Sequence, residues 1–168
     1  MVESYTLDIS ILACGLLPMG RLNEILTLAQ ARARDMGLPY AGALTPQEAG
    51  EVLQLTPDAK VIDVRTHAEL EWVGRIPGAL EIEWASYPGM QANPHFLQTL
   101  QRAVTGDSLL MFICRSGARS HHAASAATKA GYAACYNILE GFEGDKDANG
   151  QRNQISGWRH AGLPWHQG

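Results

Sequence analysis

This sequence has few basic residues, few cysteines and no apolar run long enough to cross a bilayer. Its 168 residues include 13 lysines and arginines against 17 aspartates and glutamates, which gives a formal net charge of −4. Without a basic stripe to neutralise phosphates, the chain has no feature of a nucleic-acid-binding protein. The apolar stretch 9–17 is too short for a membrane span and no lysine or arginine precedes it, so we expect a cytoplasmic protein with no membrane association.

Disulfides and metal ligands are lacking as well. The three cysteines, Cys14, Cys114 and Cys135, form no Cys-x-x-Cys pair, and no histidine cluster has the spacing of zinc ligands. Unpaired thiols fit a reducing compartment, and we expect neither a metal nor a cofactor. Residues 145–150 resemble a calcium loop, but Ser156 stands where such a loop needs its glutamate, so calcium is disfavoured.

Two parts of the chain differ in their patterning. Over 21–36 the apolar residues recur at steps of three and four, which predicts one amphipathic helix, and Gly37 ends it. We assign residues 1–42 to an N-terminal extension that carries this helix. Residues 43–168 are long enough to bury a core and are predicted to form a single domain.

Helices and strands alternate through that domain. Two capping boxes, Thr45 with Glu48 and Thr66 with Glu69, predict helices over 46–55 and 66–72. Further helices are predicted over 93–104 and 120–130, and short apolar runs predict strands over 60–64, 80–82, 108–113 and 133–139. This order indicates an α/β fold with a mostly parallel sheet and helices on both faces. The polar segment 141–157 is expected to be a surface loop, and the tryptophans are expected to pack inside, with one of them a candidate wall of the site.

The most apolar predicted strand ends at Cys114, directly before a loop that leads into a helix. Ligands of open α/β sheets bind outside the carboxyl ends of the strands, where Cys114 is expected. A loop that curls into a helix N-terminus directs backbone N–H groups inward and suits an anion such as a thiolate. Arg115 and Arg119 add guanidinium groups that match an oxyanion, and Gly117 allows a tight turn. Cys135, within a predicted strand, is expected to be a core residue.

At this point the sequence resembles the rhodanese-like domain family over about residues 43–166. The resemblance rests on motifs in the family's order: Thr45-Pro46-Gln47-Glu48-Ala49, Val61-Ile62-Asp63-Val64-Arg65 with Glu69, Gly74-Arg75-Ile76-Pro77-Gly78-Ala79, the loop 114–120, Gly131-Tyr132, Leu139-Glu140-Gly141, and Gly157-Trp158 to Pro164-Trp165. Arg75 stands where histidine is commonest in the family. Each motif is weak alone, but their shared order makes a chance match improbable.

The resemblance implies a five-stranded sheet and a sulfurtransferase. Cys114 would take a sulfane sulfur from a small anionic donor such as thiosulfate and pass it to a thiophilic acceptor, which is cyanide, a thiol or a protein. The substrate-binding loop would comprise Arg115, Ser116, Gly117, Ala118, Arg119 and Ser120. By the same resemblance Arg115 and Arg119 would hold the donor. Asp63, Arg65 and Arg75 are the residues expected to support the loop, and an ordinary salt bridge explains Asp63 and Arg65 equally well.

Two other classes of function stay open. Cysteine phosphatases and arsenate reductases of related fold need the arginine six residues after the cysteine, but Ser120 occupies that position here. The shorter loop encloses a smaller pocket, better suited to one sulfur atom. A non-catalytic rhodanese-like module is the second alternative, because a fold does not by itself imply activity. Retention of Cys114 and both arginines argues against it.

Overall fold

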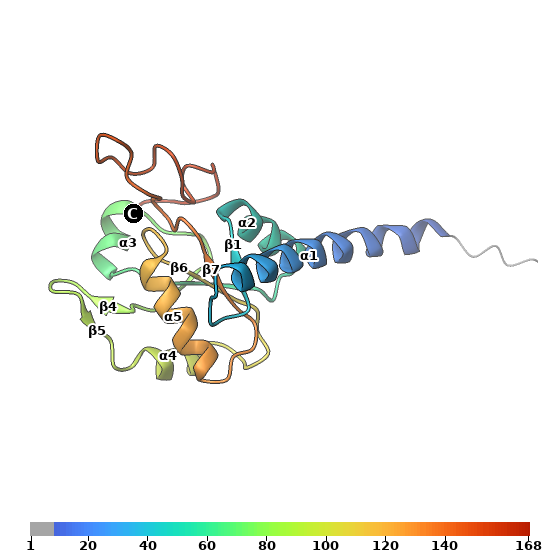
Figure 1. Ribbon diagram of the computed structural model, residues 1–168, viewed down its shortest axis with the longest axis horizontal. Helices are drawn as coiled ribbons and strands as arrows, with labels where there is room; N and C mark the ends of the chain where they lie inside the picture. Colours follow the sequence, from blue (N-terminus) through green and yellow to red (C-terminus); the bar gives the residue numbers. More distant parts are fainter. Residues whose placement is uncertain (1–8) are drawn as a thin grey trace, which may run out of the picture.

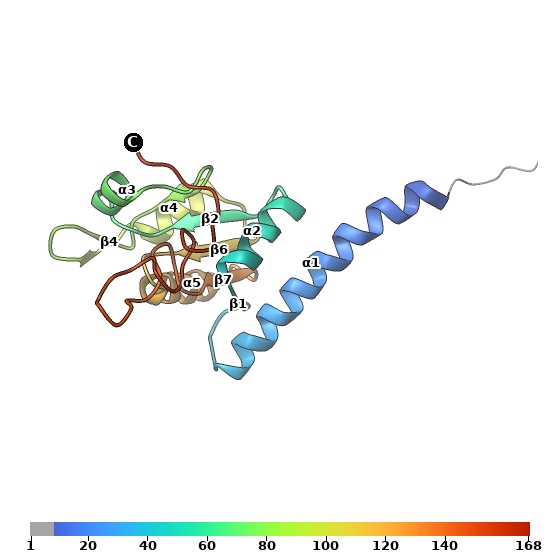
Figure 2. The same cartoon turned by 90° about the horizontal axis from the view of Figure 1, so that it is seen from above.

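The computed structural model describes the backbone of residues 9–168 and the side chains of residues 19–168. Its elements are α1 (Ile9–Asp35), β1 (Gly42–Leu44), α2 (Pro46–Leu55), β2 (Lys60–Asp63), α3 (His67–Val73), β3 (Leu80–Glu81), β4 (Ala85–Ser86), β5 (Gln91–Ala92), α4 (Phe96–Ala103), β6 (Leu110–Ile113), α5 (Ala118–Lys129) and β7 (Cys135–Ile138). The N-terminal part of α1 projects away from the body of the domain (Figures 1 and 2).

Five strands form one sheet in the order β1-β7-β6-β2-β3. Every neighbouring pair in this sheet is parallel. A separate antiparallel hairpin, β4–β5, follows β3 in the chain. The predicted α/β fold with a five-stranded sheet is therefore confirmed.

Helices cover both faces of the sheet, and the alternation of side chains along β6 shows how. Met111 and Ile113 pack in a cluster with residues of α1 and α2, whereas Phe112 and Cys114 pack in a second cluster with α4 and α5. All four residues of β6 are buried, as expected for a central parallel strand covered on both faces. The Cys114 side chain therefore lies on the face of the sheet that α4 and α5 cover.

The local signals behave as predicted at two helix starts. At α2 and at α3, the side chain of the capping threonine accepts a hydrogen bond from the backbone amide of the glutamate three residues later. The side chain of that glutamate accepts a hydrogen bond from the backbone amide of the threonine. These reciprocal bonds satisfy backbone donors that have no partner within the helix.

Some expectations need correction. The N-terminal helix is longer than predicted, β1 and the β4–β5 hairpin were not foreseen, and α5 begins two residues before the predicted start. Trp158 is buried, but Trp72 is 71% exposed and does not pack in the core. Cys14 lies outside the part of the chain whose side chains are described. No helix in the described part is both long and apolar enough to cross a membrane.

Candidate active site

Cys114 follows directly on the carboxyl end of β6, and α5 begins four residues later at Ala118. Gly117, the residue before the helix, has φ of 100°, in the left-handed region that favours glycine. This turn folds the chain back over Cys114. The loop-to-helix arrangement predicted around the cysteine is thus present.

The Cys114 sulfur receives two hydrogen bonds. The Gly117 amide donates to Sγ over 3.2 Å and the Ser120 hydroxyl over 3.3 Å. The sulfur also lies at the N-terminal end of α5, a helix of 12 residues whose dipole adds partial positive charge there. These groups favour negative charge on the sulfur. Cys114 itself is only 1% exposed, so the loop encloses it.

The segment that follows β7 is hydrogen-bonded to the loop 114–120. The amide of Phe142 donates to the carbonyl oxygen of Cys114 over 2.8 Å, and the amide of Glu143 donates to that of Arg115 over 3.0 Å. Between β7 and these residues lies Gly141, with φ of 68°. A Cβ atom there would lie 2.5 Å from the Cys114 carbonyl oxygen. The start of the predicted surface loop is therefore buried against the loop 114–120.

Asp63 and Arg65 form a fully buried ion pair beside the loop. The Arg65 Nη2 donates to Asp63 Oδ2 over 2.6 Å and also to the carbonyl oxygen of Gly74 over 2.9 Å. The Arg65 guanidinium carbon lies 3.8 Å from the centre of the Phe142 ring. Because the Phe142 amide binds the loop, the pair contacts the loop through this residue. A buried pair of this kind needs both partners, since either charge alone is costly to desolvate.

Arg119 is engaged by a carboxylate. Its Nη1 and Nη2 atoms donate to the two oxygens of Glu69 over 2.7 and 2.6 Å. Burial alone would raise the pKa of Glu69, but the hydrogen bonds and charge of Arg119 and the bonds at Thr66 lower it to about 2. Burial lowers the pKa of Arg119, and the hydrogen bonds and charge of Glu69 outweigh this and raise it. This pairing was not predicted, because Glu69 was assigned to a helix cap and to a family motif, without an ion-pair partner.

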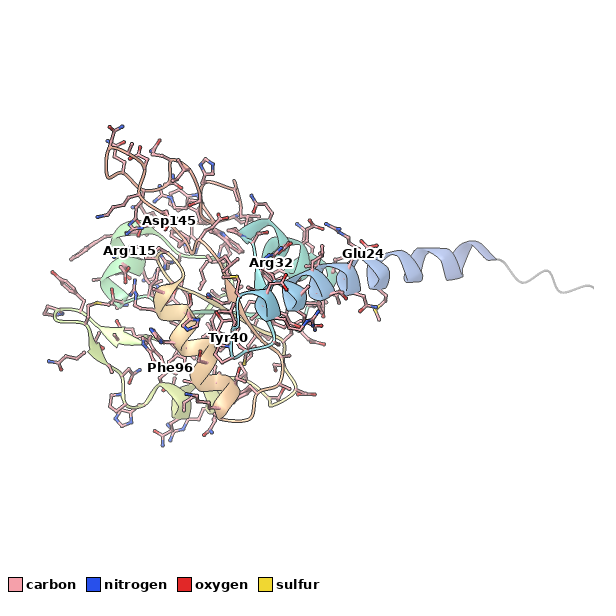
Figure 3. All side chains as sticks on the ribbon, viewed as in Figure 1. Glu24, Arg32, Tyr40, Phe96, Arg115 and Asp145 are labelled. Atoms are coloured by element: carbon pink, nitrogen blue, oxygen red, sulfur yellow. The ribbon has the colours of Figure 1, made fainter. Side chains whose placement is uncertain are left out.

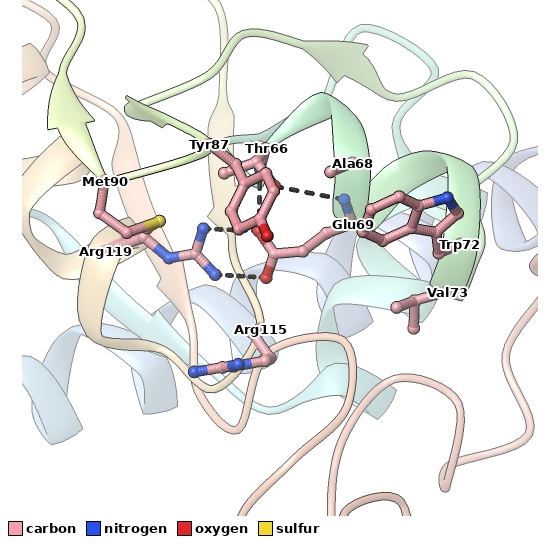
Figure 4. Close-up of a pocket in the computed structure, with 9 residues that line it drawn as sticks. All are labelled: Thr66, Ala68, Glu69, Trp72, Val73, Tyr87, Met90, Arg115 and Arg119. Carbon is pink, nitrogen blue, oxygen red and sulfur yellow. Dashed lines mark hydrogen bonds and ion pairs between the residues drawn. The ribbon is translucent and has the colours of Figure 1, made fainter.

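A pocket of about 380 Å³ opens beside the loop (Figure 4). Arg115 and Arg119 line it from the loop, Trp72 from α3, and Tyr87 and Met90 from the hairpin. Arg115 is exposed and lies on the side of the domain away from the projecting part of α1 (Figure 3). Among the described ion pairs, none includes Arg115.

The remaining residues of the predicted loop differ in exposure. Ser116 is half-buried, Ala118 is exposed and Ser120 is buried against the cysteine. Asn137 of β7 adds a hydrogen bond of 3.3 Å from its side chain to the Gly117 carbonyl oxygen.

Arg75 contacts other parts of the chain. Its guanidinium pairs with Glu71 and with Glu81, the latter over 2.6 Å, and its backbone pairs with His166. None of these partners belongs to the loop 114–120.

Cys135 lies far from Cys114 along the sheet. Its register partner on β6 is Leu110, four residues before Cys114. At about 3.3 Å per residue, this offset separates the two positions by about 13 Å. Burial raises the pKa of the Cys135 thiol. Both features fit a core residue.

The described residues include no group of three or more His, Cys, Asp and Glu side chains arranged to hold a metal ion. Within the segment 145–150, Asp147 Oδ1 accepts the backbone amides of Asn149 and Gln151, so this carboxylate oxygen stabilises the turn.

Fold and site together define a class: a parallel α/β domain in which a strand ends in a cysteine and a short loop returns the chain to a helix N-terminus. The rhodanese-like domain family model matches residues 45–148. The uncharacterized protein RP600 of Rickettsia prowazekii is 36% identical over 120 residues, which cover 70% of this chain and 91% of the relative. The chain belongs to the rhodanese-like domain family.

Solved structures also resemble this chain. Rv0390 from M. tuberculosis is 42% identical, with a TM-score of 0.71, and the match covers 77% of this chain and 99% of Rv0390. A polysulfide-sulfur transferase homodimer from Wolinella succinogenes shares the fold at 19% identity, with a TM-score of 0.53 and coverage of 96% of this chain and 95% of that one.

Proposed function

We propose that this protein is a sulfurtransferase in which Cys114 carries a transferable sulfur as a persulfide. The observation that carries the proposal is the position of the Cys114 sulfur, which accepts hydrogen bonds from Gly117 and Ser120 at the N-terminal end of α5. Donors fixed in this way stabilise a thiolate before the reaction and again when it becomes the leaving group. The family membership and the fold shared with a polysulfide-sulfur transferase support the same reading.

The reaction has two displacement steps. With thiosulfate as donor, the Cys114 thiolate attacks the outer sulfur, the sulfur–sulfur bond of the donor breaks, and sulfite leaves with the bonding electron pair. The acceptor, which is cyanide, a thiol or a protein cysteine, then attacks the outer persulfide sulfur. The new bond to the acceptor forms as the persulfide bond breaks, and the Cys114 thiolate is regenerated.

The loop residues Arg115 to Ser120 would bind the transferred sulfur and the donor. Arg115 offers the exposed guanidinium, whereas Arg119 reaches the same pocket already paired with Glu69. Asp63 and Arg65 would support the loop through Phe142. Because Cys114 is 1% exposed, the rim must move as the donor enters, a motion typical of surface loops.

We further propose that the protein acts in the cytoplasm. The two described cysteines are free thiols, which fits a reducing compartment.

Intact mass spectrometry after incubation with thiosulfate tests the function. The wild type and Cys135→Ser should each gain one sulfur atom, which cyanide removes as thiocyanate, while Cys114→Ser should gain none. A wild type that takes up no sulfur from any donor would instead indicate a non-catalytic rhodanese-like module.

A further inference from the structure

Both groups that donate hydrogen bonds to the Cys114 sulfur belong to the N-terminal end of α5. Gly117 is the residue directly before the helix, and Ser120 lies in its first turn. Hydrogen bonds weaken steeply when the donor turns away from the acceptor. A small displacement of this helix end would therefore weaken both bonds at once, so whatever fixes the helix end also fixes the groups that stabilise the thiolate.

Asn137 of β7 holds this end of the helix. Its Nδ2 atom donates to the carbonyl oxygen of Gly117 over 3.3 Å, and the backbone amide of His121 donates to the same oxygen over 3.2 Å. Asn137 pairs in register with Phe112 of β6, which precedes Cys114 by two residues. The side chain of Asn137 therefore ties the start of α5 to the sheet beside the cysteine.

The stability of the core does not account for an asparagine at this position. Asn137 is only 3% exposed, and its Oδ1 atom has no hydrogen-bond partner among the described residues. A buried polar atom without a partner costs free energy, and an apolar side chain of similar size would avoid that cost. An apolar side chain, however, could not donate to the Gly117 carbonyl. The asparagine therefore serves the helix end at the cost of some stability.

Tyr40, in the link between α1 and β1, supports the same point. It is 6% exposed and packs in the cluster that contains Cys114. Its hydroxyl oxygen lies 2.9 Å from Nδ1 of His121, and the two rings meet edge to face with centres 5.4 Å apart. Burial raises the pKa of Tyr40, and a hydrogen bond from Asn137 lowers it by less. Tyr40 thus contacts both residues whose N–H groups donate to the Gly117 carbonyl.

From these contacts, and resting on the proposed sulfurtransferase function, we infer that Asn137 and Tyr40 are positioning residues that fix the N-terminal end of α5 and so keep Cys114 ionised for sulfur transfer. Both act through the start of the helix and not on the reacting sulfur. Tyr40 precedes residue 45, where the match to the family model begins. The N-terminal extension therefore contributes a side chain to the support of the active site.

The ionisation of Cys114 tests the inference. The thiolate is measured by its ultraviolet absorbance, as the difference between each protein and the same protein with Cys114→Ser. All proteins are compared at the pH at which half of the wild-type Cys114 is ionised. Asn137→Ala removes the amide that holds the helix end, and Tyr40→Phe removes the hydroxyl and keeps the packed ring. The rate of sulfur loading from thiosulfate is measured in parallel by intact mass.

Each variant has a matched control. Tyr136→Phe also removes a buried hydroxyl that bonds to the N-terminal extension, because Gln30 of α1 donates to it over 3.3 Å, but Tyr136 packs in the cluster on the other face of the sheet. Asn93→Ala also removes a side-chain amide that donates to a backbone carbonyl, that of Glu83, over 2.8 Å. Neither control touches the helix end.

We expect the ratio of ionised to neutral Cys114 to fall by about two- to tenfold in Asn137→Ala, the range of one hydrogen bond, and by about twofold in Tyr40→Phe, with a parallel fall in the loading rate. Both controls should keep the wild-type values. If Asn137→Ala fails to fold, Tyr40→Phe decides. An unchanged ratio in the folded variants, or an equal fall in the controls, would overturn the inference and leave the proposed function intact. Absence of sulfur on wild-type Cys114 with every donor would overturn both.

Discussion

Replacing Gly141 by alanine should displace the loop 114–120 in addition to straining the backbone at position 141. At φ of 68° an L residue lies in the left-handed region, which costs about 1–2 kcal/mol. The added Cβ would also lie 2.5 Å from the Cys114 carbonyl oxygen and 2.6 Å from the Ser116 amide nitrogen. These neighbours are backbone atoms, so the loop or the segment 140–143 must shift, at a typical overpacking cost of about 1–3 kcal/mol.

Gly37 provides a matched control. Its φ is 64° and nothing lies within 4 Å of an added Cβ, so Gly37→Ala carries the backbone strain without the clash. In urea unfolding we expect Gly141→Ala to lower the free energy of unfolding by about 2–5 kcal/mol and Gly37→Ala by about 1–2 kcal/mol. The rate of persulfide formation should fall in Gly141→Ala alone. Equal stability losses in the two variants, with an unchanged rate, would refute the idea that Gly141 allows the loop to close.

Three further predictions address the ion pairs and the second thiol. Since the pKa of Glu69 is lowered from 4.5 to about 2, its ionisation stabilises the fold above pH 4.5 by up to about 3 kcal/mol, and this stability is lost as the pH falls toward 2. Urea unfolding between pH 2 and 7 should show that loss in wild type and lack it in Glu69→Gln. Asp63→Asn leaves the buried Arg65 charge without its partner and should cost about 3–5 kcal/mol in the same measurement, so a loss below 1 kcal/mol would contradict the assigned burial of the pair. Cys135→Ala should still form the Cys114 persulfide, as measured by intact mass, because about 13 Å separate the two positions along the sheet. Loss of the persulfide in a folded variant would assign Cys135 a role in transfer.

The sequence predicted those features that depend on residues close together in the chain. Both capping boxes and the succession of strand, loop and helix at Cys114 are local patterns. The three residues of β1 contain no β-branched side chain, and β4 and β5 have two residues each, so neither periodicity nor composition marks them. In α1, Pro18 and Gly20 interrupt the pattern before Arg21 and favour a later start than the one observed.

Contacts between distant segments explain what the sequence did not predict at the site. Glu69 and Arg119 are 50 residues apart, and the glutamate had an adequate local explanation as a helix cap. The closeness of Gly141 to the Cys114 carbonyl depends on β7 lying beside β6, which no local pattern specifies. The tryptophans were expected to pack inside, with one of them a candidate wall of the site. Trp72 lines the pocket together with Tyr87 of the hairpin, and that hairpin was not foreseen.

The paired backbones of 114–115 and 142–143 also limit how this protein could be redesigned. Enlarging the loop 114–120 so that it could enclose a tetrahedral phosphate would require an inserted residue. A residue inserted directly after Cys114 would shift the carbonyl group that now accepts from Glu143. The two hydrogen bonds from the amides of Phe142 and Glu143 could then no longer form together. Any change of specificity by insertion must therefore be made near Gly117, or be accompanied by a compensating change after β7.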